Sequence, residues 1–212
     1  MTTTRRTILA GLALLAAAPS AFAKAPVFAP LSADDQALVA KAAAYLQGLA
    51  GAKGRFIQTD ARGSVTQGTF LLQRPGKARF AYDPPAGLTM ASNGSVVSIL
   101  NTRLKTFESY PLGVTPLAIF LAKEIRLDRG VVITKVDRLS DGFTILARDG
   151  KRQAEGQIQL TFTDAPMALS GWTLIDAQGQ PTRVRLIDFA PAGPFAGDLF
   201  DLKNPYRIAP IR

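Results

Sequence analysis

The stretch from Gly54 to Pro85 constrains the fold of this chain most, because apolar and polar residues alternate along three short runs within it. Large apolar side chains recur at every second position, and arginine, lysine and glutamine occupy positions between them. Turn-forming residues at Asp60–Gly63 and Arg74–Gly76 separate the runs. The pattern predicts an antiparallel meander of three strands with one apolar face, which needs a cover.

Residues 1–23 have the organisation of a cleaved export signal. Arg5 and Arg6 give a cationic start, Ile8–Ala18 is an apolar run too short to span a bilayer, and Ala21-Phe22-Ala23 is a small-x-small cleavage site. We therefore expect cleavage after Ala23 and export of the rest of the chain. The arginine pair leaves the general secretory and the twin-arginine route both open. Residues 24–31, which contain two prolines, are expected to form a tether, and residues 32–212 a single domain.

Two helices are predicted to cover the sheet. Ser32 followed by Asp35 is an N-cap signal, and the apolar spacing within Leu38–Leu49 predicts a helix with one apolar face. A shorter segment, Leu117–Ala122, follows Thr115-Pro116 as predicted N-cap and first helical residue, and it is apolar on every side. Such a helix must lie between two apolar layers or over an apolar cavity, and the sequence leaves both arrangements open.

The rest of the chain has mostly the pattern of strands. Period-two runs recur between residues 88 and 110 and between residues 131 and 189, and Leu199–Leu202 is predicted to form a last short strand. A single antiparallel sheet of about eleven strands has to curl. We therefore expect a mostly β fold with helices, in the form of an unclosed half-barrel.

Composition excludes several kinds of chemistry. The chain contains no histidine and no cysteine, which rules out a Ser-His-Asp triad, a Cys-His pair, a His- or Cys-ligated metal site and disulfides. Paired-carboxylate catalysis is disfavoured because the aspartates stand mostly beside turn residues. The net charge of +9 indicates either transient contact with anionic membranes or a solvated face. Stacking aromatics of the kind that accompany nucleic-acid binding are not set among the arginines. We expect no enzyme activity, no cofactor and no metal.

A series of short motifs then narrows the interpretation. In chain order they are Phe56-Ile57-Gln58, Gln67–Phe70, Arg74-Pro75, Phe80–Tyr82, Thr115-Pro116 and Leu199–Leu202. Each motif is weak alone. In this order, behind an export signal, they resemble the family of the periplasmic lipoprotein carrier LolA, and the likeness extends over most of the chain after residue 23.

The resemblance implies a fold and a function. The fold is an unclosed barrel whose helices form a lid over an apolar cavity for lipoprotein acyl chains. The function is that of a monomeric periplasmic carrier, which accepts lipoproteins from an inner-membrane releasing transporter and delivers them to the outer membrane, with a separate receptor there left open. An alternative on the same half-barrel is a periplasmic regulator that senses lipid or peptide. No nucleic acid is expected as a partner.

The resemblance also implies roles for particular residues. Arg74 is the expected lid latch, bonding to the lid helices in the closed form, and its alternative is an arginine that bonds the carbonyls of its own turn. Ala78 departs from the family, which usually has a bulky aromatic residue there. The expected cavity wall and lid, each with ordinary core packing as the alternative, consist of Phe56, Phe70, Leu72, Phe80, Tyr82, Met90, Ile99, Leu117, Phe120 and Leu121.

Overall fold

One curled antiparallel sheet dominates the computed structural model, which describes residues 30–115, 117–125, 127, 130–150 and 156–206. Within these residues eleven strands pair in the order β6-β5-β4-β3-β2-β1-β11-β10-β9-β8-β7. The sheet is not closed, because β6 and β7 form its two edges. The predicted half-barrel is thereby confirmed. The expected export signal, most of the expected tether and Pro116 lie outside the described residues.

The strands follow the chain in two meanders that meet where β1 pairs with β11. The first meander consists of β1 (Gly51–Thr59), β2 (Val65–Gln73), β3 (Lys77–Tyr82), β4 (Leu88–Asn93), β5 (Val96–Asn101) and β6 (Thr106–Pro111). The second consists of β7 (Val131–Arg138), β8 (Gly142–Asp149), β9 (Gln157–Asp164), β10 (Met167–Ile175) and β11 (Pro181–Pro191). Short turns join most successive strands, so the sheet grows by neighbours.

The period-two pattern becomes the concave face of the sheet. Residues directly opposite each other on paired strands point to the same side. Phe70 lies opposite Phe80, Phe80 opposite Met90, and Met90 opposite Ile99. These residues form a row across four strands, and the polar residues between them face outward. The predicted alternation therefore produces one apolar interior.

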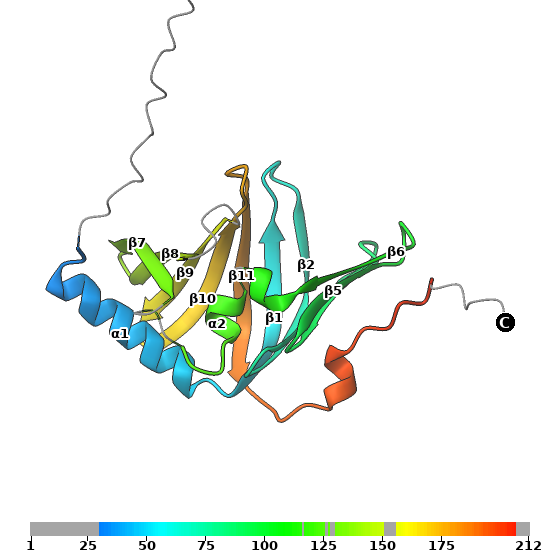
Figure 1. The fold of residues 1–212 in the computed structure, drawn as a ribbon, viewed down its shortest axis with the longest axis horizontal. Coiled ribbons are helices and arrows are strands. Elements are labelled where there is room, and N and C mark those ends of the chain that lie inside the picture. Colours follow the sequence, from blue (N-terminus) through cyan, green and yellow to red (C-terminus); the bar gives the residue numbers. More distant parts are fainter. Residues whose placement is uncertain (1–29, 116, 126, 128–129, 151–155, 207–212) are drawn as a thin grey trace, which may run out of the picture.

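Two helices lie against this interior. Helix α1 (Ala33–Gly48) begins at the predicted cap, where the Ser32 hydroxyl accepts a hydrogen bond from the Asp35 amide at 3.1 Å. Its buried residues are Leu38, Ala42 and Leu46. Helix α2 (Ala118–Leu121) lies in the hollow of the curled sheet, with α1 along one side (Figure 1). Neither helix, nor any other in the described residues, is long and apolar enough to cross a membrane.

The start of α2 differs from the sequence prediction. Leu117 occupies the N-cap position, and a 3-10 helix, η1 (Leu112–Val114), comes before it. Thr115 ends η1, and its hydroxyl donates to the Leu112 carbonyl at 2.8 Å. The Thr115 side chain is therefore used by the preceding turn, and the prediction that it caps α2 is wrong.

The predicted last strand is also wrong. The segment forms a second described 3-10 helix, η3 (Gly197–Phe200), on the outer face of β3 and β4. Both of these strands are already paired on each side, so they offer no edge for another strand. Instead, the Phe200 ring is buried, and Arg79 donates to the Leu199 carbonyl at 2.8 Å.

Candidate functional site

The segment between β6 and β7 covers the concave face, and its described residues from Leu112 to Leu127 are called the lid segment below. Most of its large apolar side chains are removed from solvent. The buried ones are Leu112, Leu117, Phe120, Leu121, Ile125 and Leu127. Because α2 is apolar all round, its other two residues, Ala118 and Ile119, are also packed against the core. The lid segment is thus an apolar plug in the half-barrel.

Aromatic rings connect the lid segment to the wall. The Phe120 ring on α2 lies 5.4 Å from the ring of Trp172 on β10, centroid to centroid. Trp172 in turn meets Phe80 edge-on at 5.7 Å, and Phe80 meets Phe56 edge-on at 5.4 Å. Such pairs add about 0.5–1.5 kcal/mol each beyond the area they bury. The chain has a single tryptophan, and this residue lies directly under the lid.

The structure brings most of the residues predicted for the cavity and lid into one core. Those that are buried are Phe56, Phe70, Leu72, Phe80, Leu117, Phe120 and Leu121. Tyr82 and Met90 are half-buried and pack against the same cluster. Ile99 is half-buried beyond it, opposite Met90. In this closed structure the side chains pack against one another, so the protein itself fills the space expected for a guest.

Tyr82 places one polar group within this apolar wall. Its hydroxyl donates to the Gln58 side-chain oxygen at 2.7 Å. Burial raises the pKa of Tyr82 to about 12, although the hydrogen bond to Gln58 acts in the opposite direction. The phenol is therefore neutral at physiological pH and supplies no charge to the interior.

The wall is thin at the end of β3 next to the lid. Ala78 is buried and lies opposite Leu72 on one side and Ser92 on the other. The Ser92 hydroxyl donates to the Gly76 carbonyl at 2.7 Å, and the Gly76 amide donates to the Leu121 carbonyl at 2.8 Å. Small side chains on two adjacent strands thus stand beside the turn that holds the end of α2.

Arg74, in the turn between β2 and β3, bonds to both helices. One terminal nitrogen of its guanidinium donates to the carbonyl of Leu46 in the last turn of α1. The other donates to the carbonyls of Ala122, at 2.6 Å, and Lys123, at 3.3 Å, just after α2. The Arg74 side chain therefore contacts the lid segment instead of the carbonyls of its own turn.

The environment of Arg74 suits a cation. The last carbonyls of a helix have no partner within it and carry partial negative charge, so a guanidinium is a favourable donor for them. Burial lowers the pKa of Arg74, which reflects the cost of removing the charge from water. Its Nε is buried and makes no hydrogen bond within the described structure. The hydrogen bonds to the helix ends act against this burial cost.

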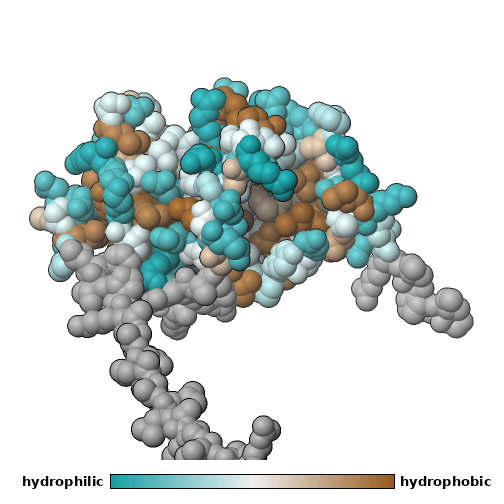
Figure 2. Space-filling view, turned by 90° about the horizontal axis from the view of Figure 1, so that it is seen from above, coloured by the Kyte–Doolittle hydropathy of each residue, from teal (hydrophilic) through white to brown (hydrophobic). Residues whose placement is uncertain are grey.

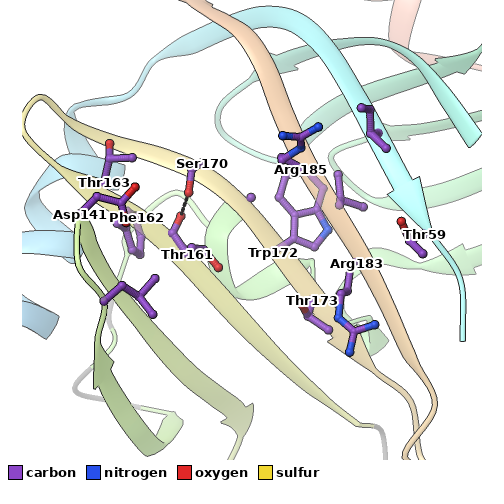
Figure 3. Close-up of a pocket in the computed structure, with 14 residues that line it drawn as sticks. Thr59, Asp141, Thr161, Phe162, Thr163, Ser170, Trp172, Thr173, Arg183 and Arg185 are labelled. Atoms are coloured by element: carbon purple, nitrogen blue, oxygen red, sulfur yellow. Dashed lines mark hydrogen bonds between the residues drawn. The ribbon is translucent and has the colours of Figure 1, made fainter. Parts of the chain in front are cut away.

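Surface grooves differ in what they could hold. Seen from above, hydrophobic residues line a hollow in the surface (Figure 2). A groove of about 560 Å³ on the outer face of β9, β10, β11 and β1 combines apolar side chains such as Trp172 with hydroxyl and charged groups, including Thr161, Thr173, Arg183 and Arg185 (Figure 3). Its hydroxyl and guanidinium groups are polar partners that a hydrocarbon chain cannot use.

A second groove lies at the edge of the lid segment. It has a volume of about 520 Å³ and runs between α1, the lid segment and β7. Its lining is mostly apolar and includes Val39, Ala43, Ile125, Leu127 and Ile133. An apolar chain that moved the lid would find continuous apolar surface from this groove into the core.

Sequence reasoning missed several residues of this arrangement. Trp172 could have been found, because it lies on the apolar side of a predicted strand. Ile125 and Leu127 follow the predicted short helix without a periodic pattern of their own. Gln47 has no sequence signal, because its contacts with the lid segment depend on where α1 lies in three dimensions.

Known proteins similar to this chain include one family and several solved structures. A family model described as outer membrane lipoprotein carrier protein LolA matches residues 47–203. Among solved structures, an uncharacterized conserved protein from Thermus thermophilus is 9% identical with a TM-score of 0.48, and the match covers 81% of this chain and 96% of that one. A LolA superfamily protein from Nitrosomonas europaea is also 9% identical with a TM-score of 0.48, and the match covers 79% and 97%. No curated protein matches the chain.

Proposed function

Because this chain belongs to the family of the outer membrane lipoprotein carrier protein LolA, we propose that it carries lipoproteins by binding their acyl chains between its sheet and its lid segment. In this proposal it accepts lipoproteins released from the inner membrane, crosses the periplasm and delivers them to the outer membrane. The export signal predicted in residues 1–23 supports a periplasmic location. The observation that carries the proposal is an apolar plug in an aromatic interior, fastened just after the C-terminal end of its helix by hydrogen bonds from Arg74 to backbone carbonyls.

The energies of plug and cargo are of the same order. An acyl chain with about 14 methylenes costs on the order of 11 kcal/mol in water, at about 0.8 kcal/mol for each methylene. Exposing one buried Leu, Ile or Phe side chain costs about 1.5–3 kcal/mol, so exposing five costs on the order of 10 kcal/mol. The five in question are Leu117, Phe120, Leu121, Ile125 and Leu127. Cargo can therefore replace the lid segment with little net change, which suits a carrier that must also release it.

A carrier of this kind needs a lid that cargo can displace. Hydrogen bonds from a charged donor each contribute about 1.5–3 kcal/mol, offset here by the burial of the guanidinium. A ligand shifts a two-state equilibrium by its difference in affinity for the two states. The bonds of Arg74 to the lid segment are few enough for an acyl chain to outweigh them, and we propose that Arg74 is the latch.

The single tryptophan supplies a direct binding assay. Trp172 is buried under Phe120, so displacement of the lid changes its surroundings. Titration with a triacylated lipopeptide should give a saturable change in tryptophan emission, and the same peptide without acyl chains should give none. An emission spectrum that stays constant during the titration would contradict acyl-chain binding under the lid.

The transport step is tested in cells. Depletion of the protein should leave outer-membrane lipoproteins in the inner membrane, and the protein purified from the periplasm should carry acylated peptides detectable by mass spectrometry. Normal lipoprotein sorting in depleted cells would refute the transport role. Normal sorting together with bound lipid would instead favour the lipid-sensing alternative.

A further inference from the structure

We infer that Gln47 is a second residue that holds the lid segment closed, acting from α1 on the peptide groups that follow α2. The inference deepens the proposed function and rests on it for its biological meaning, because it concerns how the same lid opens. Gln47 lies in the last turn of α1 and is exposed. An exposed glutamine at the end of a helix has no packing reason to contact a neighbouring segment, yet both polar groups of its amide bond to the lid segment.

The contact with Ile125 is the stronger one. The side-chain oxygen of Gln47 accepts a hydrogen bond from the Ile125 amide at 2.9 Å. The Ile125 side chain is buried, and a backbone amide there needs a partner. Because the segment after α2 belongs to no strand or helix among the described residues, no regular ladder supplies one. The Gln47 side-chain oxygen is therefore the hydrogen-bond partner of this amide.

The second contact joins Gln47 to the latch. Its side-chain nitrogen donates to the Lys123 carbonyl at 3.4 Å, and Arg74 donates to the same oxygen at 3.3 Å. Both side chains therefore bond to one peptide group, from α1 on one side and from the β2–β3 turn on the other. Opening the lid requires both to release it.

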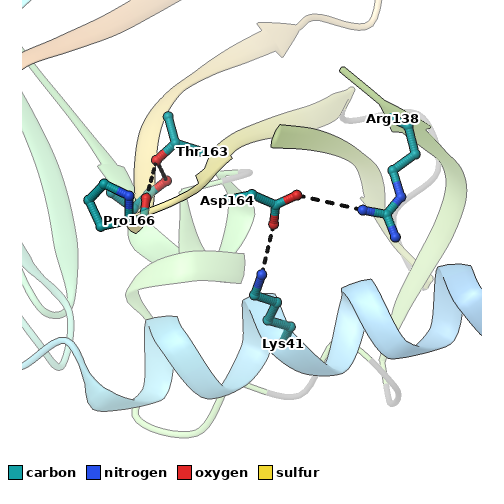
Figure 4. A network of polar contacts seen from close by, with 6 residues as sticks. Lys41, Arg138, Thr163, Asp164 and Pro166 are labelled. Carbon is teal, nitrogen blue, oxygen red and sulfur yellow. Dashed lines mark hydrogen bonds and ion pairs between the residues drawn. The ribbon is translucent and has the colours of Figure 1, made fainter. Parts of the chain in front are cut away.

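Helix α1 is fastened to the sheet independently of the lid. The Lys41 ammonium lies 2.7 Å from one oxygen of Asp164 at the end of β9, and the other oxygen lies 3.6 Å from Arg138 on β7 (Figure 4). Leu38, Ala42 and Leu46 are buried beneath the helix. Helix α1 thus remains in place as a support, and Gln47 bonds the movable segment to it.

Amide hydrogen exchange of the complete protein tests this inference. A Gln47→Met variant keeps the length of the side chain and loses both hydrogen bonds. Two such bonds, one of them long, predict about fivefold faster exchange, which corresponds to about 1 kcal/mol at 1.36 kcal/mol for each factor of ten. The amides to follow are those of Ile125, which bonds Gln47, and Leu121, which bonds the Leu117 carbonyl instead.

Exchange at the Leu121 amide distinguishes a role of Gln47 in holding the whole lid closed from a purely local hydrogen bond to Ile125. If Gln47 holds the lid closed, exchange should increase at Leu121 and Ile125 together. If Gln47 is only a local partner, exchange should increase at Ile125 alone, and the inference is overturned. A Gln47→Glu variant keeps an oxygen for the Ile125 amide, so exchange there should stay within about twofold of wild type.

Gln36 provides a matched control, because it is a glutamine on the same helix whose side chain donates to the Leu31 carbonyl at 2.9 Å. A Gln36→Met variant should leave exchange at Leu121 and Ile125 unchanged. Palmitate binding, measured through Trp172 emission, distinguishes failure of the Gln47 inference from failure of the proposed carrier function. Palmitate binding with unchanged exchange at Leu121 in Gln47→Met rejects only the role of Gln47. Faster exchange without palmitate binding supports the role of Gln47 and counts against the proposed carrier function.

Discussion

Replacing Arg74 by leucine should open the lid without unfolding the protein. The substitution removes three hydrogen bonds from the guanidinium to Leu46, Ala122 and Lys123. Opening the lid breaks the two bonds to the lid segment, at Ala122 and Lys123, whereas Leu46 stays with α1 on the sheet. At about 1.5–3 kcal/mol each, and offset in part by desolvation of the guanidinium, these two bonds contribute about 2–3 kcal/mol net to the closed state. At 1.36 kcal/mol for each factor of ten, the open fraction should rise about 30- to 150-fold.

The loss of global stability has an upper limit. The bonds of Arg74 to the lid segment stabilise only the closed native state, so a protein that lacks them reaches the open native state before it unfolds. The free energy of unfolding therefore falls by no more than the difference between the closed and open states. Hydrogen exchange at the Gly76 and Leu121 amides should accelerate by the full factor, because the Gly76 amide bonds the Leu121 carbonyl across the closed lid and the Leu121 amide bonds the Leu117 carbonyl at the start of α2.

Arg79 offers a control on the same hairpin. It is an arginine on β3 that donates to one carbonyl, that of Leu199, on the outer face of the sheet. An Arg79→Leu variant removes the same charge from the protein and should leave exchange at Leu121 as in wild type. The reasoning is refuted if both variants accelerate exchange equally, or if Arg74→Leu exchanges as slowly as wild type. It is also refuted if the Arg74→Leu variant fails to fold, because Arg74 is then required for the fold itself.

Three further predictions concern the wall and the plug. Phe120 in the lid and Phe143 in the wall are both buried rings. In urea titrations Phe143→Ala should lower the free energy of unfolding by about 3–5 kcal/mol, and Phe120→Ala should lower it by less. Equal losses would indicate that the lid belongs to a fixed core. Ala78→Phe should overpack the wall and lower the free energy of unfolding by about 1–3 kcal/mol. Ala81→Phe, on the outer side of the same strand, should lower it by under about 0.5 kcal/mol. If Ala78→Phe costs as little as Ala81→Phe, the wall has room for a larger side chain. Tyr82 should make stability fall at high pH. Because folding raises its pKa from 10 to about 12, its stabilising effect is complete below pH 10 and is lost as the pH rises through 12. Wild type should lose about 2 kcal/mol more than Tyr82→Phe at pH 12, and parallel pH profiles would contradict this.

The period of the apolar residues determined most of the fold. Alternation along strands such as Gln157–Asp164 places side chains on two faces, and no other element satisfies that spacing. Local turn residues set the strand ends, so the bounds of most strands follow from the sequence to within a few residues. Two local predictions failed. The Thr115 hydroxyl bonds the carbonyl of the preceding turn instead of capping α2. Gly197–Phe200 forms a 3-10 helix because its hydrogen bond to Arg79 comes from a distant part of the chain.

The residues of the candidate site also fall into those that the sequence identified and those that only the tertiary structure revealed. The sequence alone identified the apolar residues, since their chemistry and spacing are local properties, and the family resemblance singled out Arg74. Only the tertiary structure decided that Phe120 lies over Trp172, and that Arg74 and Gln47 bond to one carbonyl, that of Lys123. Gln47 and Lys123 are 76 positions apart in the chain. A hydrogen bond over that separation depends on how the sheet curls and where α1 lies, which no local pattern encodes.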